Sequence, residues 1–119
     1  MRVFKFGGAS VKDASSVINL KNILLKEEKN LVVIASAMGK TTNNLEKIWE
    51  LYISQQTEKA INKLRDLVSY HKEIYSALQL ENNKAFISDF NTLYNQLSDF
   101  ISSNNTSKNA YSYDQIVAY

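Results

Sequence analysis

Two short stretches of this chain carry residue types suited to binding anions and small polar molecules. They are KFGGAS at residues 5–10 and SAMGKTTN at residues 36–43, and together they contain all 3 glycines of the 119 residues. Glycine lets a backbone approach a ligand closely because it has no Cβ atom in the way. In a chain with so little glycine, this placement marks both stretches as candidate binding turns.

The first turn offers a cation beside a pair of glycines. Lys5 lies near the carboxyl end of a predicted strand, at the edge where open α/β sheets bind ligands. Gly7 and Gly8 then lead toward a helix, and the backbone N–H groups at a helix start attract anions. The Lys5 ammonium could neutralise phosphate oxygens bound there. The residues alone leave a second interpretation open, in which the glycines form a plain turn and Lys5 extends into water.

The second turn is rich in hydroxyls and also runs from a strand into a helix. The hydroxyls of Ser36, Thr41 and Thr42 could hold the carboxylate and the amine of a small polar ligand. Its Gly-Lys-Thr triplet does not complete a P-loop, because that motif needs a glycine five positions earlier, where this chain has isoleucine. Taken alone, the turn fits a simple helix cap at Thr42 or Asn43 better. Two such turns at one sheet edge favour a binding site instead.

The rest of the chain offers no second set of catalytic groups. Without cysteine there is no disulfide scaffold or thiolate nucleophile, and with 1 histidine we expect no metal centre. That histidine, His71, falls in line with apolar residues of a predicted helix, so we expect a partly buried structural role. Trp49 is expected in the helix-packing core. Glu58, Lys59 and Lys63 are expected on a solvated face.

The composition is that of one globular domain, with 45% hydrophobic and 22% charged residues. A net charge of +2 is too small to indicate a nucleic acid or a membrane as partner. No apolar run approaches the roughly 20 residues that a membrane span needs, and the start shows no secretory signal. We therefore expect a cytoplasmic protein with neither of these partners.

The elements that position the two turns form a strand–helix–strand unit. RVFKF at 2–6 is short, aromatic and branched, and LVVIA at 31–35 is a continuous apolar run, so both are predicted to be buried strands. Residues 14–28 between them place apolar side chains at helical spacing, and Ser10 or Asp13 could cap the start of that helix. A crossover of this length predicts a right-handed βαβ unit with parallel strands.

A mainly helical segment follows. Asn43 with Glu46 resembles a capping box, which predicts a helix start at this point. The apolar residues after it recur at helical spacing and are Leu45, Ile48, Trp49, Tyr52 and Ile53. Two more helices are predicted at about 57–80 and 84–102, and the polar stretch 102–109 is predicted to be a loop.

This organisation is incomplete as an α/β domain. We divide the chain into a βαβ unit with both turns at 1–43, a helical segment at 44–102, and a loop with the start of a helix near Asp114 at 103–119. Two parallel strands do not make a stable sheet, and parallel sheets are covered on both faces by helices from further βαβ units. We therefore expect residues 1–119 to be the N-terminal part of a larger α/β protein.

Three stretches resemble the aspartokinases of the amino-acid kinase superfamily. KFGGASV at 5–11 resembles the KFGGTSV signature with which aspartokinases open. VVIASAMGKTTN at 32–43 resembles their second signature, and YDQIVAY at 113–119 is similar to the segment before their Gly-Glu pair. The departure is Ala9 where threonine is usual, which removes one hydroxyl. The matches come in the right order and span the chain.

The resemblance implies an incomplete three-layer αβα amino-acid kinase fold and the activity of an aspartate kinase. Such enzymes transfer the γ-phosphoryl of MgATP to the side-chain carboxylate of L-aspartate, in the biosynthesis of lysine, threonine and methionine. It implies a homo-oligomer for the full-length protein. It also implies that the glutamate that contacts aspartate and the nucleotide-binding half lie beyond Tyr119, so this chain alone is expected to be inactive.

The resemblance also assigns roles to single residues. Lys5 is the catalytic residue, placed against the transferring phosphoryl group. The residues that bind the ATP phosphates are Lys5, Gly7, Gly8 and Ser10. Ser36 and Thr42 are assigned to the aspartate site, and no residue is assigned to a metal. Two alternatives stay open: a kinase for glutamate, acetylglutamate or uridylate, whose Lys-Gly-Gly start lacks the SAMGKTTN stretch, and a non-catalytic interaction module formed by 44–102.

Overall fold

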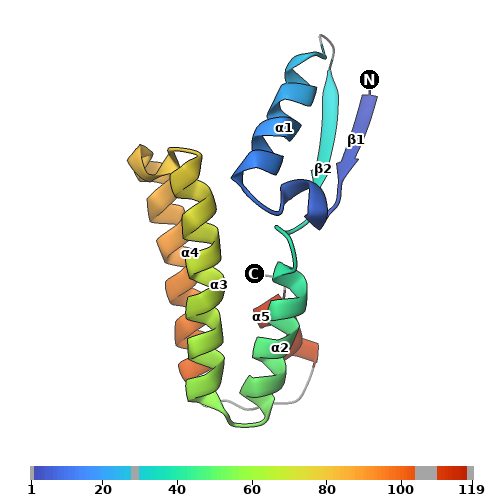
Figure 1. The fold of residues 1–119 in the computed structure, drawn as a ribbon. Helices are drawn as coiled ribbons and strands as arrows, with labels where there is room; N and C mark the ends of the chain where they lie inside the picture. Colours follow the sequence, from blue (N-terminus) through green and yellow to red (C-terminus); the bar gives the residue numbers. More distant parts are fainter. Residues whose placement is uncertain (1, 28–29, 104–109, 118–119) are drawn as a thin grey trace. The chain divides into compact units, whose positions relative to one another are not determined.

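The computed structural model describes residues 2–27, 30–103 and 110–117. They belong to two compact units, one up to Thr41 and the other from Thr42 onward. Figure 1 shows the two strands in the first unit and the long helices in the second. None of the helices in the described ranges is both long and apolar enough to cross a membrane.

The first unit is the predicted strand–helix–strand arrangement. Its elements are β1 (Arg2–Phe6), the short 3₁₀ helix η1 (Gly8–Val11), α1 (Ala14–Leu25) and β2 (Leu31–Ala35). The two strands are parallel and pair in register from Arg2 with Leu31 to Phe6 with Ala35. The prediction of parallel strands at 2–6 and 31–35 is confirmed, and with it the α/β class.

The start of α1 is set by a local hydrogen bond. The Asp13 carboxylate accepts the backbone N–H of Ser16 at 2.8 Å, as a helix cap does. The predicted end near residue 28, which lies outside the described residues, is too late. The helix ends at Leu25, where the Lys26 N–H turns to the carbonyls of Ile23 and Leu24.

One face of the two-stranded sheet exposes apolar side chains. Successive strand residues point to opposite faces, so Phe4 and Phe6 share one face and Val3 lies on the other. Phe4 and Phe6 are half-buried, while Val3 and its partner Val32 are 56% and 39% exposed. Exposed branched residues on a parallel sheet fit the expectation of an incomplete αβα fold.

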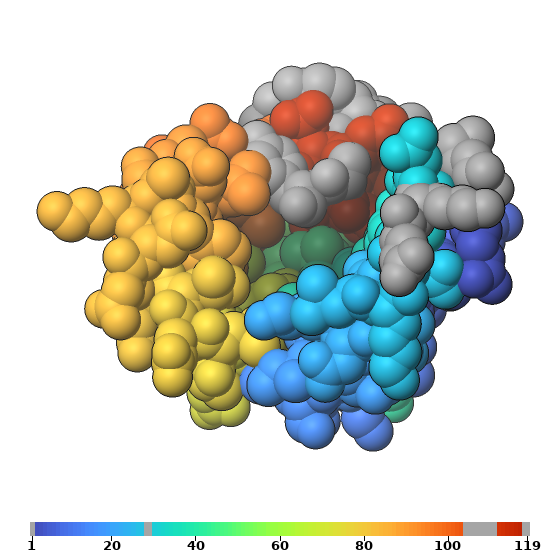
Figure 2. Space-filling model, turned by 90° about the horizontal axis from the view of Figure 1, so that it is seen from above, coloured from blue at the N-terminus to red at the C-terminus, as the bar shows by residue number. Residues whose placement is uncertain are grey.

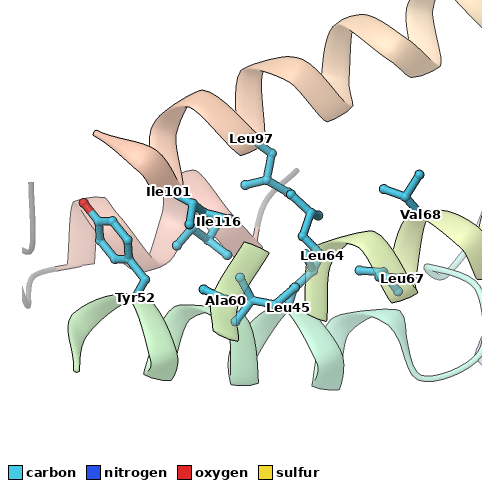
Figure 3. Close-up of a cluster of buried hydrophobic side chains, with 10 residues drawn as sticks. Leu45, Tyr52, Ala60, Leu64, Leu67, Val68, Leu97, Ile101 and Ile116 are labelled. Atoms are coloured by element: carbon cyan, nitrogen blue, oxygen red, sulfur yellow. The ribbon is translucent and has the colours of Figure 1, made fainter. Parts of the chain in front are cut away.

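The second unit consists of helices around one apolar core. Its elements are α2 (Thr41–Ile53), α3 (Thr57–Ala77), the 3₁₀ helix η2 (Leu80–Asn82), α4 (Lys84–Ser102) and α5 (Ala110–Val117). The long helices α3 and α4 lie side by side, as Figure 2 shows for their yellow and orange ends. Figure 3 shows Tyr52, Ile101 and Ile116 meeting in the core from α2, α4 and α5. α3 ends before residue 80 because Gln79 adopts a left-handed conformation at φ 62°.

The capping box predicted at Asn43 and Glu46 is wrong. α2 already begins at Thr41, so Asn43 lies inside the helix. The Glu46 carboxylate instead accepts the hydroxyl of Tyr113 at 2.8 Å, which ties α5 to α2. Helix formation is cooperative, so a helix that begins at Thr41 continues through Asn43 although asparagine is a common capping residue.

α5 begins before the predicted start at Asp114, and much of the predicted loop 102–109 lies outside the described residues. The helix runs from Ala110 and is docked by polar contacts that apolar periodicity does not reveal. Ser112 is only 1% exposed and accepts the Trp49 indole N–H at 3.1 Å. The Tyr113 ring meets the Trp49 ring edge to face, with 5.3 Å between ring centroids.

The Asp13 cap predicts a pH dependence of stability. The hydroxyl and the backbone N–H of Ser16 both donate to the Asp13 carboxylate and hold its pKa below the usual aspartate value. A lowered native pKa stabilises the fold above the unfolded value of about 3.9, and this contribution is lost as the pH falls through the native pKa. Asp13→Asn keeps an acceptor but cannot titrate. Lowering the pH from about 5 to about 2 should lower the melting temperature of the wild type more than that of Asp13→Asn. Thermal unfolding of both proteins at each pH checks this, and parallel curves of melting temperature against pH would contradict it.

Candidate functional site

Residues 5–10 and 36–41 of the two predicted turns belong to the first unit and lie side by side. Parallel pairing brings the carboxyl ends of β1 and β2 to the same edge of the sheet, so the turns that follow start together. The Ser36 N–H donates to the Phe6 carbonyl at 2.9 Å and extends the strand pairing by one residue. Further along, the Gly39 N–H donates to the Gly8 carbonyl at 3.1 Å. The prediction that both turns share one edge is confirmed.

The close approach of the turns requires glycine at position 8. A Cβ atom built on Gly8 would lie 2.4 Å from the Gly39 carbonyl oxygen and 3.2 Å from the Ala37 carbonyl oxygen. Both neighbours are backbone atoms, which cannot rotate away as a side chain can. Any side chain at position 8 therefore forces the two turns apart.

Gly7 is under no such constraint. It caps η1 in an extended conformation, with φ −77° and ψ 174°, and a Cβ atom on it would meet nothing within 4 Å. Both values are open to residues with side chains. The adjacent glycines, which look equivalent in the sequence, thus differ in role: Gly8 supplies the contact between the turns.

The second turn is closed by Gly39 and Thr41. Gly39 has φ 54°, in the left-handed region that residues with a Cβ rarely adopt. Thr41 is 7% exposed, and both its N–H and its hydroxyl donate to the Met38 carbonyl. A hydroxyl has one proton to donate, and in this arrangement the Thr41 proton is donated to the Met38 carbonyl and not to a ligand carboxylate. Its hydroxyl holds the turn instead.

Lys5 is placed where its charge can meet an anion. It is the fourth residue of β1 and pairs with Ile34, and its side chain is exposed. Within the described residues, the one salt bridge joins Arg2 to Glu27, so Lys5 makes none. A lysine ammonium at the carboxyl edge of a parallel sheet is available to a bound phosphate.

The remaining predicted site residues lie at different places in the fold. Ser10 lines a cavity of about 310 Å³ together with Phe6, Ala9 and Lys12 and with four residues of α1: Ser16, Asn19, Leu20 and Ile23. Lys5 does not line this cavity, because neighbouring strand residues point to opposite faces. Ser36 is exposed directly after β2, beside the end of β1. Thr42 is the exposed second residue of α2 and belongs to the helical unit.

No other part of the described chain forms a competing catalytic group. His71 is half-buried in α3 with its Nδ1 atom 2.9 Å from the Leu67 carbonyl oxygen, so the prediction of a structural role is confirmed. Residues 2–27, 30–103 and 110–117 contain no cluster of three side chains that could hold a metal ion. A second cavity, of about 410 Å³ between α2 and α3, includes Lys47 and Lys63 but none of the predicted site residues.

Substitutions of the two glycines of the first turn are expected to have opposite effects on stability. Gly8→Ala is expected to lower the free energy of unfolding by about 1–3 kcal/mol, because the added methyl meets backbone oxygens. Gly7→Ala serves as the matched control and is expected to raise stability by about 0.4–1 kcal/mol, because it restricts the unfolded chain without a clash. Urea unfolding of both variants checks this, and equal effects would show that the contact has no steric consequence.

Comparisons with known proteins agree with the motifs. No family model matches the chain. An aspartokinase of Bacillus sp. (strain MGA3) is 48% identical over 46 residues, which are 36% of this chain and 11% of that protein. Aspartokinase 2, chloroplastic, of Arabidopsis thaliana is 45% identical over 49 residues, 40% of this chain and 9% of that protein. The matched segments therefore cover about a tenth of the length of these relatives.

Solved structures match the fold over almost the whole chain. The crystal structure of E. coli aspartokinase III in complex with aspartate and ADP (R-state) has a TM-score of 0.81 at 21% identity. The match covers 99% of this chain and 25% of that one. The complex of the same enzyme with lysine and aspartate (T-state) has a TM-score of 0.82 at 21% identity, with the same coverage. The chain thus resembles the aspartokinases in sequence over 44–49 residues and has the fold of about a quarter of an aspartokinase.

Proposed function

We propose that this chain is part of an aspartate kinase, which transfers the γ-phosphoryl group of ATP to the side-chain carboxylate of L-aspartate. The products are β-aspartyl phosphate and ADP. The observation that carries the proposal is the hydrogen bond from the Gly39 N–H to the Gly8 carbonyl, which holds an anion-suited turn beside a hydroxyl-bearing one. The likeness to aspartokinases, one of which was solved with aspartate and ADP, supports this choice of ligands.

The residues at this edge suit phosphoryl transfer. The reaction asks for positioning and charge stabilisation, and the acceptor carboxylate is already ionised near neutral pH, so no general base is required. We propose that Lys5 neutralises charge on the transferring group, while Gly7, Gly8 and Ser10 hold the donor phosphates. Ser36 and Thr42 are proposed to hold the acceptor.

The described residues fit the nucleotide phosphates better than they fit a free metal ion. Backbone amides and a lysine are phosphate ligands, whereas the described part of the chain offers no cluster of three metal-ligating side chains. We propose that Mg²⁺ arrives with the nucleotide, because this ion commonly binds through substrate phosphates and few protein carboxylates. No step proposed above depends on it. The homo-oligomeric state and the cytoplasmic location stay predictions of the sequence.

The alternatives have less support. A kinase for another acceptor would share the fold, but the curated relatives that match in sequence are aspartokinases. A non-catalytic module at 44–102 would need an exposed apolar patch. In the described part of the second unit, Leu93, at 49%, is the one large hydrophobic side chain that is exposed.

The reaction itself is tested by coupled assays of ADP release. We expect the 119-residue chain alone to show no sustained aspartate-dependent turnover, because it spans about a quarter of the matched enzyme. The full-length protein that contains this chain should release ADP when aspartate is supplied, and its ligands should raise its melting temperature. Glutamate, acetylglutamate and uridylate serve as control acceptors. Turnover with one of these in place of aspartate would contradict the proposal, as would sustained turnover by the short chain.

The role of Lys5 is tested in the same full-length protein. We expect Lys5→Ala to lower kcat by about 10³-fold or more, because it removes charge stabilisation that matters most in the transition state. The KM for aspartate should change by only a few-fold. Lys21→Ala is the matched control, since Lys21 is an exposed lysine of α1. Near-normal turnover of Lys5→Ala would remove this residue from the mechanism.

A further inference from the structure

The contact between the two turns is reciprocal and uses backbone atoms on both sides. The Gly39 N–H donates to the Gly8 carbonyl at 3.1 Å, and the Gly39 carbonyl oxygen occupies the space that a Cβ atom on Gly8 would need. Gly39 makes this contact from a left-handed conformation at φ 54°. The geometry therefore demands glycine at position 8 for space and a residue that tolerates positive φ at position 39.

We propose that Gly39 is a positioning residue that aligns the phosphoryl donor with the acceptor. This inference rests on the proposed function, in which the first turn holds the donor phosphates and the second turn holds the carboxylate acceptor. Gly39 acts through Gly8 and not on a ligand, because its N–H is already taken by the Gly8 carbonyl. Its effect is on the separation of the two bound groups.

Other contacts do not fix this separation in place of Gly39. The bond from the Ser36 N–H to the Phe6 carbonyl holds the strand ends, three residues before Gly39 along the second turn. Thr41 closes the second turn on itself through the Met38 carbonyl and does not reach the first turn by these bonds. The Gly8–Gly39 bond is therefore the link at the level of the turns themselves.

A shift of the turns should affect alignment more than binding. Each turn keeps its own ligand-binding groups when the link is broken, so each substrate can still bind. The reacting atoms must be held close together and in line, and a displacement of about 1 Å can cost about 100-fold in rate. The expected signature is a fall in kcat with little change in either KM.

The test uses two substitutions at the same position in the full-length protein that carries this chain. Valine disfavours positive φ strongly, whereas asparagine tolerates it. We expect Gly39→Val to lower kcat about 100-fold, with the KM values for ATP and aspartate each within about 3-fold. Gly39→Asn should keep kcat within about 10-fold of the wild type. Unchanged kcat in Gly39→Val, a loss confined to KM, or equal losses in both variants would overturn the inference.

A second measurement needs no activity and separates this inference from the proposed function. Hydrogen exchange followed by NMR should show slow exchange of the Gly39 amide in the wild type and fast exchange in Gly8→Ala. If the wild type has no kinase activity but this pattern holds, the proposed function fails while the link between the turns stands. Fast exchange of the Gly39 amide in the wild type would overturn the inference. If Gly39→Val does not fold, Gly39→Ala replaces it and should give an intermediate loss of kcat.

Discussion

The candidate site depends on one backbone contact, in which the turn after β2 rests against the turn after β1. The Gly39 N–H reaches the Gly8 carbonyl, and the Gly39 carbonyl oxygen fills the space where a side chain at position 8 would lie. Parallel pairing of the strands brings the two turns to one edge, but pairing alone does not bring them into contact. Without the contact, Gly8 and Gly39 would belong to two separate turns.

This arrangement explains why few side chains at the edge carry the proposed chemistry. Phosphoryl transfer between a nucleotide and a carboxylate needs charge stabilisation and alignment, which backbone amides, one lysine and a few hydroxyls can supply. The Thr41 hydroxyl is already used to close the second turn on the Met38 carbonyl. Some polar groups of the turns therefore maintain the conformation of the turns, and the others remain available to ligands.

The helical unit depends both on apolar packing and on specific polar contacts. Its core is formed by side chains from α2, α3, α4 and α5. The placement of α5 depends in addition on the buried Ser112 hydroxyl, which accepts the Trp49 indole N–H, and on Tyr113, which donates to Glu46. These bonds join residues more than 60 positions apart in sequence. They hold the last described helix against the one that begins at the second turn.

Local sequence determined the elements whose cause is local. Five-residue runs rich in aromatic and branched residues predicted β1 and β2 at their observed bounds, and Asp13, one of the two caps predicted for α1, is the one observed, because strand propensity and helix capping depend on residues close together. Only the tertiary structure decided what depends on distant neighbours. Glu46 turned from a cap into the partner of Tyr113, and Gly8 and Gly7 took different roles, because one of them faces the Gly39 carbonyl and the other faces open space. Residue types show which groups could bind a ligand, but which of them do so depends on contacts between segments that spacing along the chain does not encode.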